Sequence, residues 1–182
     1  MKKSNSTKVA LWWNKLINRN KQSVQALFIS RKGKKLKQFL VILPEHSTEA
    51  ELAKRFLKSM RNAMGPSGSN QVRLLGLESV ASLINSDDFH HYIFFTKEDL
   101  NRWGMPDKEL AFACEKIKVD ALLDLNQEFS SFSAAISRIV STPLRVGFFT
   151  EEGGDYYNIM IRRQGAELAQ SGFKEIFQIL GI

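Results

Sequence analysis

The chain has 182 residues, of which 43% are hydrophobic and 25% are charged, a composition typical of a globular domain large enough to bury a core. Its formal net charge is +7, and its one cysteine, Cys114, excludes an intramolecular disulfide and suits a reducing compartment. No apolar run reaches the ~18 residues of a membrane-spanning helix, and the patch Val9–Trp13 is too short for a signal peptide, so we expect a cytoplasmic protein.

The positive charge is concentrated at the N-terminus. Residues 1–37 contain nine lysines and two arginines, and the first acidic residue of the chain is Glu45. The remaining residues hold fifteen basic and nineteen acidic side chains, so the body is slightly acidic. This asymmetry favours an anionic partner, either RNA or the ribosome, or the inner face of a membrane. The alternative is that lysine only keeps a terminal helix in solution. The predicted anion-binding residues are Arg19, Arg31, Lys32, Lys34, Lys35 and Lys37.

The basic segment also has a helical pattern. Apolar residues within Val9–Phe28 recur at intervals of three and four, which places them on one stripe of a helix. We expect this stripe to pack on the protein's own body. The alternative is that Trp12 and Trp13 are interface anchors, with the helix lying in the headgroup plane of a membrane or against a protein partner. We therefore predict two parts, a basic helical arm at 1–37 and an α/β domain at 38–182.

Strands and helices alternate through the rest of the chain. Gln38–Leu43 is a continuous apolar run, as expected of a strand covered on both faces. Thr48 and Glu51 have the spacing of a capping box, which predicts the start of a helix. The further predicted strands are Gln71–Leu77, Tyr92–Phe95, Val119–Leu125 and Leu144–Thr150. The further predicted helices are Val80–Ile84, a short turn capped at Thr96, Pro106 to about Lys116, Phe129–Ser141 and Ala166–Leu180.

This alternation predicts the fold class. We expect an α/β protein, a single Rossmann-like three-layer unit with a mainly parallel sheet of five to six strands, preceded by the basic amphipathic N-terminal helix. The segment Tyr156–Ile161 forms the last extended run. Because Gly153 and Gly154 separate it from the strand before, we predict a hairpin whose turn needs positive backbone angles. The alternative is a flexible acidic loop over a ligand site.

Neither a metal nor a cofactor is predicted. His46, His90, His91 and Cys114 lack the short ligand spacing of a metal site, and Cys114 lies on the apolar side of a helix, where a buried inert thiol is usual. The first strand is followed by Pro44 rather than by the glycines that let a backbone approach a pyrophosphate. No phosphate-binding GxxxxGK[ST] motif occurs either.

Three polar residues remain as catalytic candidates. Glu45 and His46 follow the first strand, at the end where α/β folds bind ligands, and an acid beside a histidine can in principle move protons. Asp120 and Asp124 bracket the fourth strand, and Asp124 falls at its carboxyl end. The alternatives are that Glu45 and His46 only precede a capped helix, and that the aspartates solvate the edge of the sheet.

Residues 119–148 resemble a segment of the N-terminal half of family 9 glycosyltransferases, the lipopolysaccharide heptosyltransferase group. The matching positions are Asp124-Leu125, Ala134-Ala135 and Arg145-Val146-Gly147-Phe148. The resemblance implies half of a glycosyltransferase skeleton. In that family a Gly-Asp pair after the first strand supplies the catalytic base, whereas this chain has Pro44-Glu45-His46 there, so no base is carried over. We also predict no counterpart of the family's second, nucleotide-sugar domain.

Three other segments look like those of a family of small bacterial proteins of unknown function. They are FFTKEDLNRWGMPDKE (94–109), VDALLDLN (119–126) and RVGFFTEEGGDYYNIMI (145–161). That similarity implies a basic N-terminal helix, one α/β domain and no assigned reaction. Two functions are therefore expected. The first is a non-catalytic module that docks on an anionic surface through its arm, and the alternative is an enzyme or enzyme subunit acting on a glycan or nucleotide-sugar.

Overall fold

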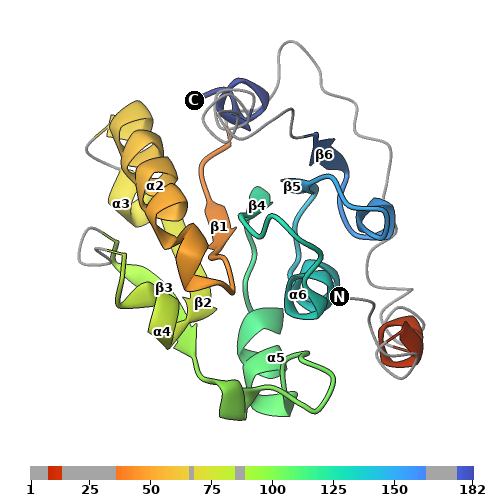
Figure 1. Ribbon diagram of the computed structural model, residues 1–182. Coiled ribbons are helices and arrows are strands. Elements are labelled where there is room, and N and C mark those ends of the chain that lie inside the picture. The colour runs from red at the N-terminus through yellow and green to blue at the C-terminus, as the bar shows by residue number, and fades with distance from the viewer. Residues whose placement is uncertain (1–7, 14–35, 66–67, 85–88, 163–175) are drawn as a thin grey trace.

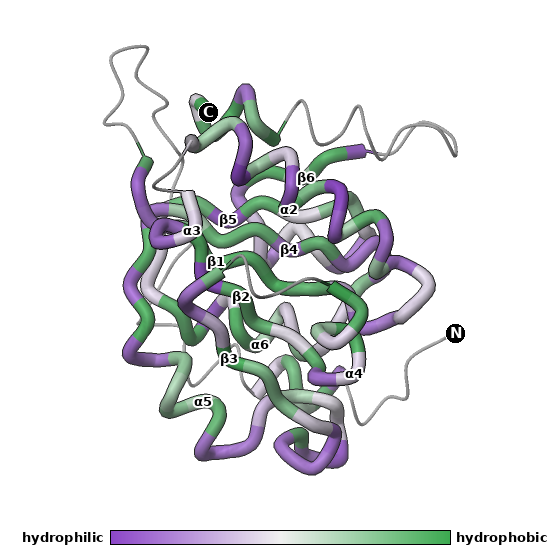
Figure 2. The backbone as a smooth tube through the Cα atoms, turned by 90° about the vertical axis from the view of Figure 1, so that its left-hand side faces the viewer, coloured by the Kyte–Doolittle hydropathy of each residue, from purple (hydrophilic) through white to green (hydrophobic). Residues whose placement is uncertain are grey.

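The computed structural model describes residues 8–13, 36–65, 68–84, 89–162 and 176–182. Within them, the strands form one six-stranded sheet in the order β3-β2-β1-β4-β5-β6, and every neighbouring pair is parallel. Figure 2 shows the strands stacked in this order, with hydrophobic residues along the middle of the molecule. The strands are β1 (Phe39–Ile42), β2 (Val72–Leu77), β3 (His91–Phe95), β4 (Ala121–Asp124), β5 (Leu144–Phe148) and β6 (Ile159–Ile161).

Helices cover both faces of the sheet (Figure 1). On one face lie α2 (Ala50–Met64), α3 (Gly68–Gln71), α4 (Glu78–Ala81) and the helical residues 176–180. On the other lie α5 (Lys108–Glu115), α6 (Ser131–Ile139) and the helical residues 8–13. Three short 3-10 turns also occur in the described ranges, η1 (Ser47–Glu49), η4 (Lys97–Asp99) and η5 (Gly153–Asp155). The three-layer α/β prediction is confirmed, and the sheet is entirely parallel.

The central strands explain why the sheet is so well enclosed. All four residues of β1 and of β4 are buried, and alternate residues feed separate cores on the two faces. Phe39 and Val41 pack under α2, whereas Leu40 and Ile42 pack on the side of α6. A strand buried on both faces needs apolar residues at every position, which is why the continuous apolar runs identified these strands correctly.

The predicted hairpin at residues 151–155 is wrong. β6 runs parallel to β5, with Val146 beside Ile159 and Phe148 beside Ile161. After β5 the chain returns through η5 to the amino-terminal end of that strand. Neither Gly153 nor Gly154 has a positive φ. A hairpin would have made β6 antiparallel to β5. The crossover instead turns Tyr156 and Tyr157 into the core on the side of α6.

The predicted capping box at Thr48 and Glu51 is also wrong. The turn η1 precedes α2, whose N-cap residue Glu49 makes no side-chain cap. The backbone amide of Glu49 donates to the His46 carbonyl at 3.0 Å, so the 3-10 turn itself engages a donor that a capping side chain would otherwise satisfy. The predicted cap at Thr96 is confirmed, since Thr96 and Asp99 form a reciprocal capping box around η4.

Candidate functional site

The carboxyl ends of β1 and β4 form the point where the strand order reverses. In doubly wound sheets, the crevice outside this switch point is where ligands bind. Glu45 follows β1 and Asp124 ends β4, so the two candidate carboxylates lie on neighbouring strand ends. Asn126 joins them. The Glu45 amide donates to Asn126 Oδ1 at 2.8 Å, and Asn126 Nδ2 donates to Asp124 Oδ1 at 2.9 Å.

Asp124 is enclosed by donors from three parts of the chain. Its Oδ1 accepts from the Asn126 amide at 3.0 Å, from Asn126 Nδ2, and from Ser133 Oγ at 3.1 Å. Its Oδ2 accepts from the Tyr157 hydroxyl at 2.5 Å. Only 5% of the residue is exposed, so the alternative that Asp124 solvates the edge of the sheet is wrong. The carboxylate ties β4 to α6 and to the segment that follows η5.

Burial raises the pKa values of both Asp124 and Tyr157. Desolvation raises the pKa of Asp124 above its ordinary value of 3.8, and the hydrogen bonds from Tyr157, Asn126 and Ser133 oppose that shift. The pKa of Tyr157 is raised well above 10, first by burial and then by the negative charge of Asp124. The phenol therefore stays protonated and acts as a hydrogen-bond donor over the whole physiological range.

Glu45 is the part of this cluster nearest to solvent. It is half-buried, and its Oε1 accepts a short hydrogen bond from Ser130 Oγ. Ser130 is also the N-cap of α6, because its Oγ accepts from the Ser133 amide at 3.0 Å. One serine hydroxyl thus satisfies the helix terminus and anchors the residue after β1. The cluster closes the switch point by linking β1, β4 and α6.

Sequence reasoning missed four members of this cluster, which are Asn126, Ser130, Ser133 and Tyr157. A signal existed for Ser130, because a serine just before an apolar helical stretch is a typical N-cap. Asn126 lies two residues beyond Asp124, at the strand end where ligands gather. Tyr157 had no readable signal, since its place depends on the crossover between β5 and β6.

The other polar candidates lie apart from the cluster. His46 is exposed beside Glu45, and His90 and His91 are exposed at the start of β3. Cys114 is fully buried on α5, as predicted, and burial raises the pKa of its thiol to about 12. The thiol is therefore protonated at neutral pH, and a protonated buried thiol is a poor nucleophile.

The Arg-x-Gly-Phe segment of β5 serves packing on the side of α6. Arg145 is 3% exposed, and its Nε donates to the Ser137 carbonyl of α6 at 2.7 Å. Burial and the charge of Arg138 lower the pKa of Arg145 to about 10. At Gly147 a Cβ atom would lie 3.1 Å from the ring of Tyr157, so glycine allows the tyrosine to reach Asp124.

Residues 8–13 correct the expectation for the apolar stripe. Ala10 and Leu11 are buried in the core cluster that contains Tyr156, whereas Val9, Trp12 and Trp13 are 55%, 55% and 54% exposed. Periodicity identified the residues that share a face of the helix, but it could not show which face meets the body. In these six residues it is the opposite face, with its small alanine, that packs inward. The predicted helix beyond Trp13 lies outside the described residues.

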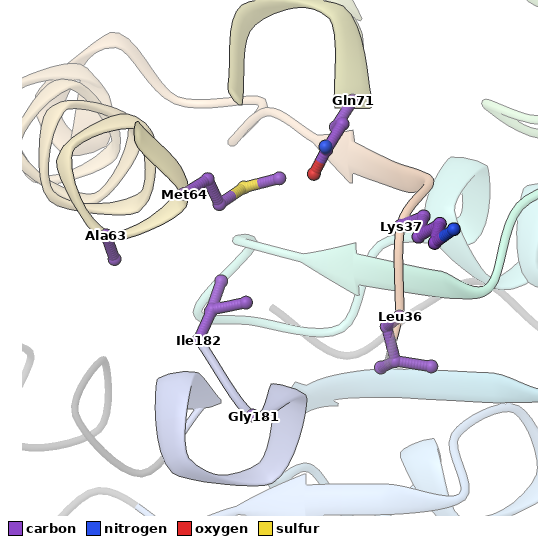
Figure 3. A pocket seen from close by; sticks show the side chains of 7 residues that line it. All are labelled: Leu36, Lys37, Ala63, Met64, Gln71, Gly181 and Ile182. Carbon is purple, nitrogen blue, oxygen red and sulfur yellow. The ribbon is translucent and has the colours of Figure 1, made fainter. Parts of the chain in front are cut away.

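Among the predicted anion-binding residues, only Lys37 falls in the described part of the chain. It borders a pocket of about 510 Å³ at the amino end of β1, and Asp120 accepts from its backbone amide at 2.8 Å. In Figure 3 the Lys37 ammonium points away from Met64 and Ile182, whereas the side-chain amide of Gln71 points toward Met64, so the pocket lining is mixed polar and apolar. The lining residues are Leu36, Lys37, Ala63, Met64, Gln71, Gly181 and Ile182.

The strand order and the hydrogen bonds at the switch point define the class of protein as a doubly wound α/β domain whose strand ends are bridged by its own polar side chains. The chain belongs to a family described as "Family of unknown function (DUF6913)", which it matches over residues 7–182. That match runs through the predicted boundary at residue 37. No curated protein and no solved structure matches the chain significantly.

Proposed function

We propose that this protein is a non-catalytic docking module that binds the anionic surface of a phospholipid membrane through its N-terminal segment. The observation that carries the proposal is the exposure of Val9, Trp12 and Trp13 within a segment of eleven basic residues. In this proposal the protein is cytoplasmic and peripheral to the inner face of the membrane. Among the described helices, none combines the length and the hydropathy of a membrane-spanning segment.

The apolar part of the surface has the geometry of an interfacial anchor. Val9, Trp12 and Trp13 are spaced by three and four residues, so they share one face of the helix. Tryptophan is favoured at the headgroup level because its ring is apolar and its indole N–H can still bond to water. The opposite face is held to the body by Ala10 and Leu11. Insertion of the outer face therefore needs no unfolding of this helical turn.

The basic part of the surface supplies long-range attraction. Each lysine or arginine near an anionic leaflet contributes about 1 kcal/mol, and the contribution is screened within a Debye length. The predicted contacts are Arg19, Arg31, Lys32, Lys34, Lys35 and Lys37. Because basic charge and an apolar anchor act together on lipid, binding should depend on both the salt concentration and the two tryptophans.

RNA phosphates would bind the same basic residues, but RNA bases would pack less well on the apolar face of the helix. Bases stack on open aromatic faces. The rings of Trp12 and Trp13 instead meet edge to face, with centroids 5.7 Å apart and an interplanar angle of 83°. Val9 extends the patch with an aliphatic side chain, which suits an acyl chain and offers a base no stacking surface. These features favour a lipid target over RNA.

The switch point supports the non-catalytic half of the proposal. The oxygens of Asp124 accept four hydrogen bonds from the protein itself, and a general base must instead reach a substrate proton. The carboxylate is therefore engaged as a structural acceptor.

Co-sedimentation with vesicles tests the proposal. The full chain is mixed with vesicles of phosphatidylcholine alone or with about one third phosphatidylglycerol, at low and high salt. We expect binding only to the anionic vesicles, weakened steeply by salt, and at least about tenfold weaker for the Trp12→Ser, Trp13→Ser double variant. Phe112→Ser is the matched control, because Phe112 is 61% exposed on α5 and should leave binding unchanged. Binding to RNA but not to vesicles, or binding that ignores both tryptophans, would overturn the proposal.

A second candidate is turnover of a glycan or nucleotide-sugar at the switch point. It is favoured by the position of half-buried Glu45, whose backbone amide is linked through Asn126 to Asp124 at the strand ends where such folds bind ligands. His46 is the adjacent exposed candidate. The purified chain would be assayed for hydrolysis or transfer with a set of nucleotide-sugars, and any activity should fall in Glu45→Gln. Turnover that is unchanged in Glu45→Gln and in His46→Ala would remove the candidate residues.

A further inference from the structure

The outer edge of β3 is the starting point. The sheet ends at β3, whose register pairs are made with β2 alone. Within the described residues, no backbone hydrogen bond joins the other edge of β3 to any segment. Alternate N–H and C=O groups of an edge strand point outward, so this edge can accept a further strand.

The two edges of the sheet differ in how well they are protected. The edge strand β6 has three residues and is followed by exposed Arg162, and a short, charged edge resists pairing. The edge strand β3 has five residues, HYIFF, with no lysine, arginine, acid or proline among them. Natural edge strands are usually interrupted by such residues, so an unprotected aromatic edge indicates a partner.

The side chains of β3 are complementary to themselves. Tyr92 is 57% exposed and stacks on Phe94, with ring centroids 4.7 Å apart and an interplanar angle of 15°. In an antiparallel pair centred on Ile93, Tyr92 of one copy lies opposite Phe94 of the other, on the same face of the sheet. Cross-strand aromatic pairs stabilise sheets, and no like charges meet along this strand. A contact of this kind uses one patch twice, as a two-fold interface requires.

We propose that β3 pairs with β3 of a second copy, antiparallel and centred on Ile93, so that one sheet continues through a homodimer. This interface lies on the edge of the sheet and is independent of the lipid-binding surface at residues 8–13. An unrelated extended peptide could fill the edge hydrogen bonds. The mirrored order of Tyr92, Ile93 and Phe94 favours a second copy instead, because it pairs both aromatic positions at once.

Sedimentation velocity over a wide concentration range tests this proposal. The wild-type chain should have the mass of two copies, and Tyr92→Lys and Tyr92→Glu should each weaken dimerisation at least about tenfold, since each places like charges diagonally across the two-fold axis. An equimolar mixture of the two variants should restore the dimer. Phe112→Lys, an equally exposed aromatic position on α5, is the matched control and should leave the wild-type dimer intact.

Circular dichroism of each variant excludes unfolding as the cause of dissociation. The proposal is overturned if the wild-type chain is a monomer at its highest soluble concentration. It is equally overturned if Tyr92→Lys dimerises as tightly as the wild type, or if the Lys and Glu variants fail to pair with each other.

Discussion

At the carboxyl edge of the sheet, a charged residue is buried and its hydrogen-bonding capacity is used by the protein. Asp124 is 5% exposed and accepts from Asn126, Ser133 and Tyr157. In residues 8–13 the arrangement is reversed, because two tryptophans, the largest apolar side chains, are more than half exposed. Burying a charge and exposing a tryptophan both cost free energy unless a partner compensates.

The difference lies in where the compensating partner is found. For Asp124 the partners are inside the chain, so the residue contributes to folding and little remains for a ligand. Trp12 and Trp13 meet each other edge to face, and more than half of each side chain stays exposed. A polar cluster at a switch point is therefore not evidence of catalysis by itself, whereas the exposure of Trp12 and Trp13 beside a basic segment supports the proposed docking.

The largest expected effect comes from Asp124→Ala. The change leaves the Tyr157 hydroxyl, the Ser133 hydroxyl and the Asn126 amide without their acceptor, and buried unsatisfied donors are costly. We expect the free energy of unfolding, measured by urea denaturation, to fall by about 3 kcal/mol. Glu128→Ala, at an exposed position nearby, is the control and should change it by less than about 0.5 kcal/mol. Equal stability of the two variants would contradict the bracing role of Asp124.

A smaller loss is expected for Gly147→Ala. The added Cβ would lie 3.1 Å from the Tyr157 ring, so the ring must shift by a few tenths of an ångström within a packed core. Such overpacking should lower the free energy of unfolding by about 1–3 kcal/mol. Gly154→Ala is matched to it, because its new Cβ would meet only Met160, at 3.8 Å, and should be nearly neutral. If both variants unfold at the same urea concentration, the close approach of Tyr157 is not a constraint on stability.

The pH dependence of stability should carry the signature of Asp124. Since burial raises its pKa above 3.8, the folded state binds this proton more tightly than the unfolded state. Its contribution is complete below pH 3.8 and is lost as the pH rises through the folded-state pKa. Asp124→Asn cannot titrate there. The stability difference, wild type minus variant, should therefore fall with rising pH, no more steeply than about 1.4 kcal/mol per pH unit. A difference that rises with pH would reverse the assigned shift.

The smallest effect on stability is expected where the effect on docking is largest. Trp12→Ser and Trp13→Ser remove exposed side chains, so each should change the free energy of unfolding by less than about 0.5 kcal/mol. Leu11→Ala, at the buried neighbour, should instead destabilise the protein by about 2 kcal/mol. Chemical denaturation of the three variants measures these changes in the free energy of unfolding. Strong destabilisation by either tryptophan change would mean that the rings serve the fold and not an outside surface.

The sheet could be predicted because its central strands are apolar at all positions but one. Residues 39–42 and 121–124 are buried throughout, and only Asp124 among these eight is polar. The last strand was predicted at Tyr156–Ile161, whereas β6 covers only Ile159–Ile161, and its pairing was predicted wrongly. A parallel connection usually needs a dozen or more residues, and the chain crosses here within residues 149–158 by means of one 3-10 turn. Spacing of two extended runs does not reveal such a short crossover.

The candidate site was predictable only in part, for a related reason. Glu45 and Asp124 follow or end strands, so the topology alone brings them together. The contact between Asn126 and Ser133 depends on how α6 packs against the end of β4. The position of Tyr157 depends on the crossover between β5 and β6. The orientation of the N-terminal helix was missed because amphipathic spacing gives the relation between its residues, and both of its faces carry apolar side chains.

The close packing of Gly147 against Tyr157 predicts how the two positions vary among members of the family. Two positions ten residues apart share one volume, and the hydroxyl that occupies it also bonds to the carboxylate of Asp124. A relative with a larger residue at the first position should have replaced the tyrosine and, with it, the aspartate. An alignment of family members should therefore show these three columns changing together, and independent substitution among them would mean that the family tolerates another way of filling the crevice.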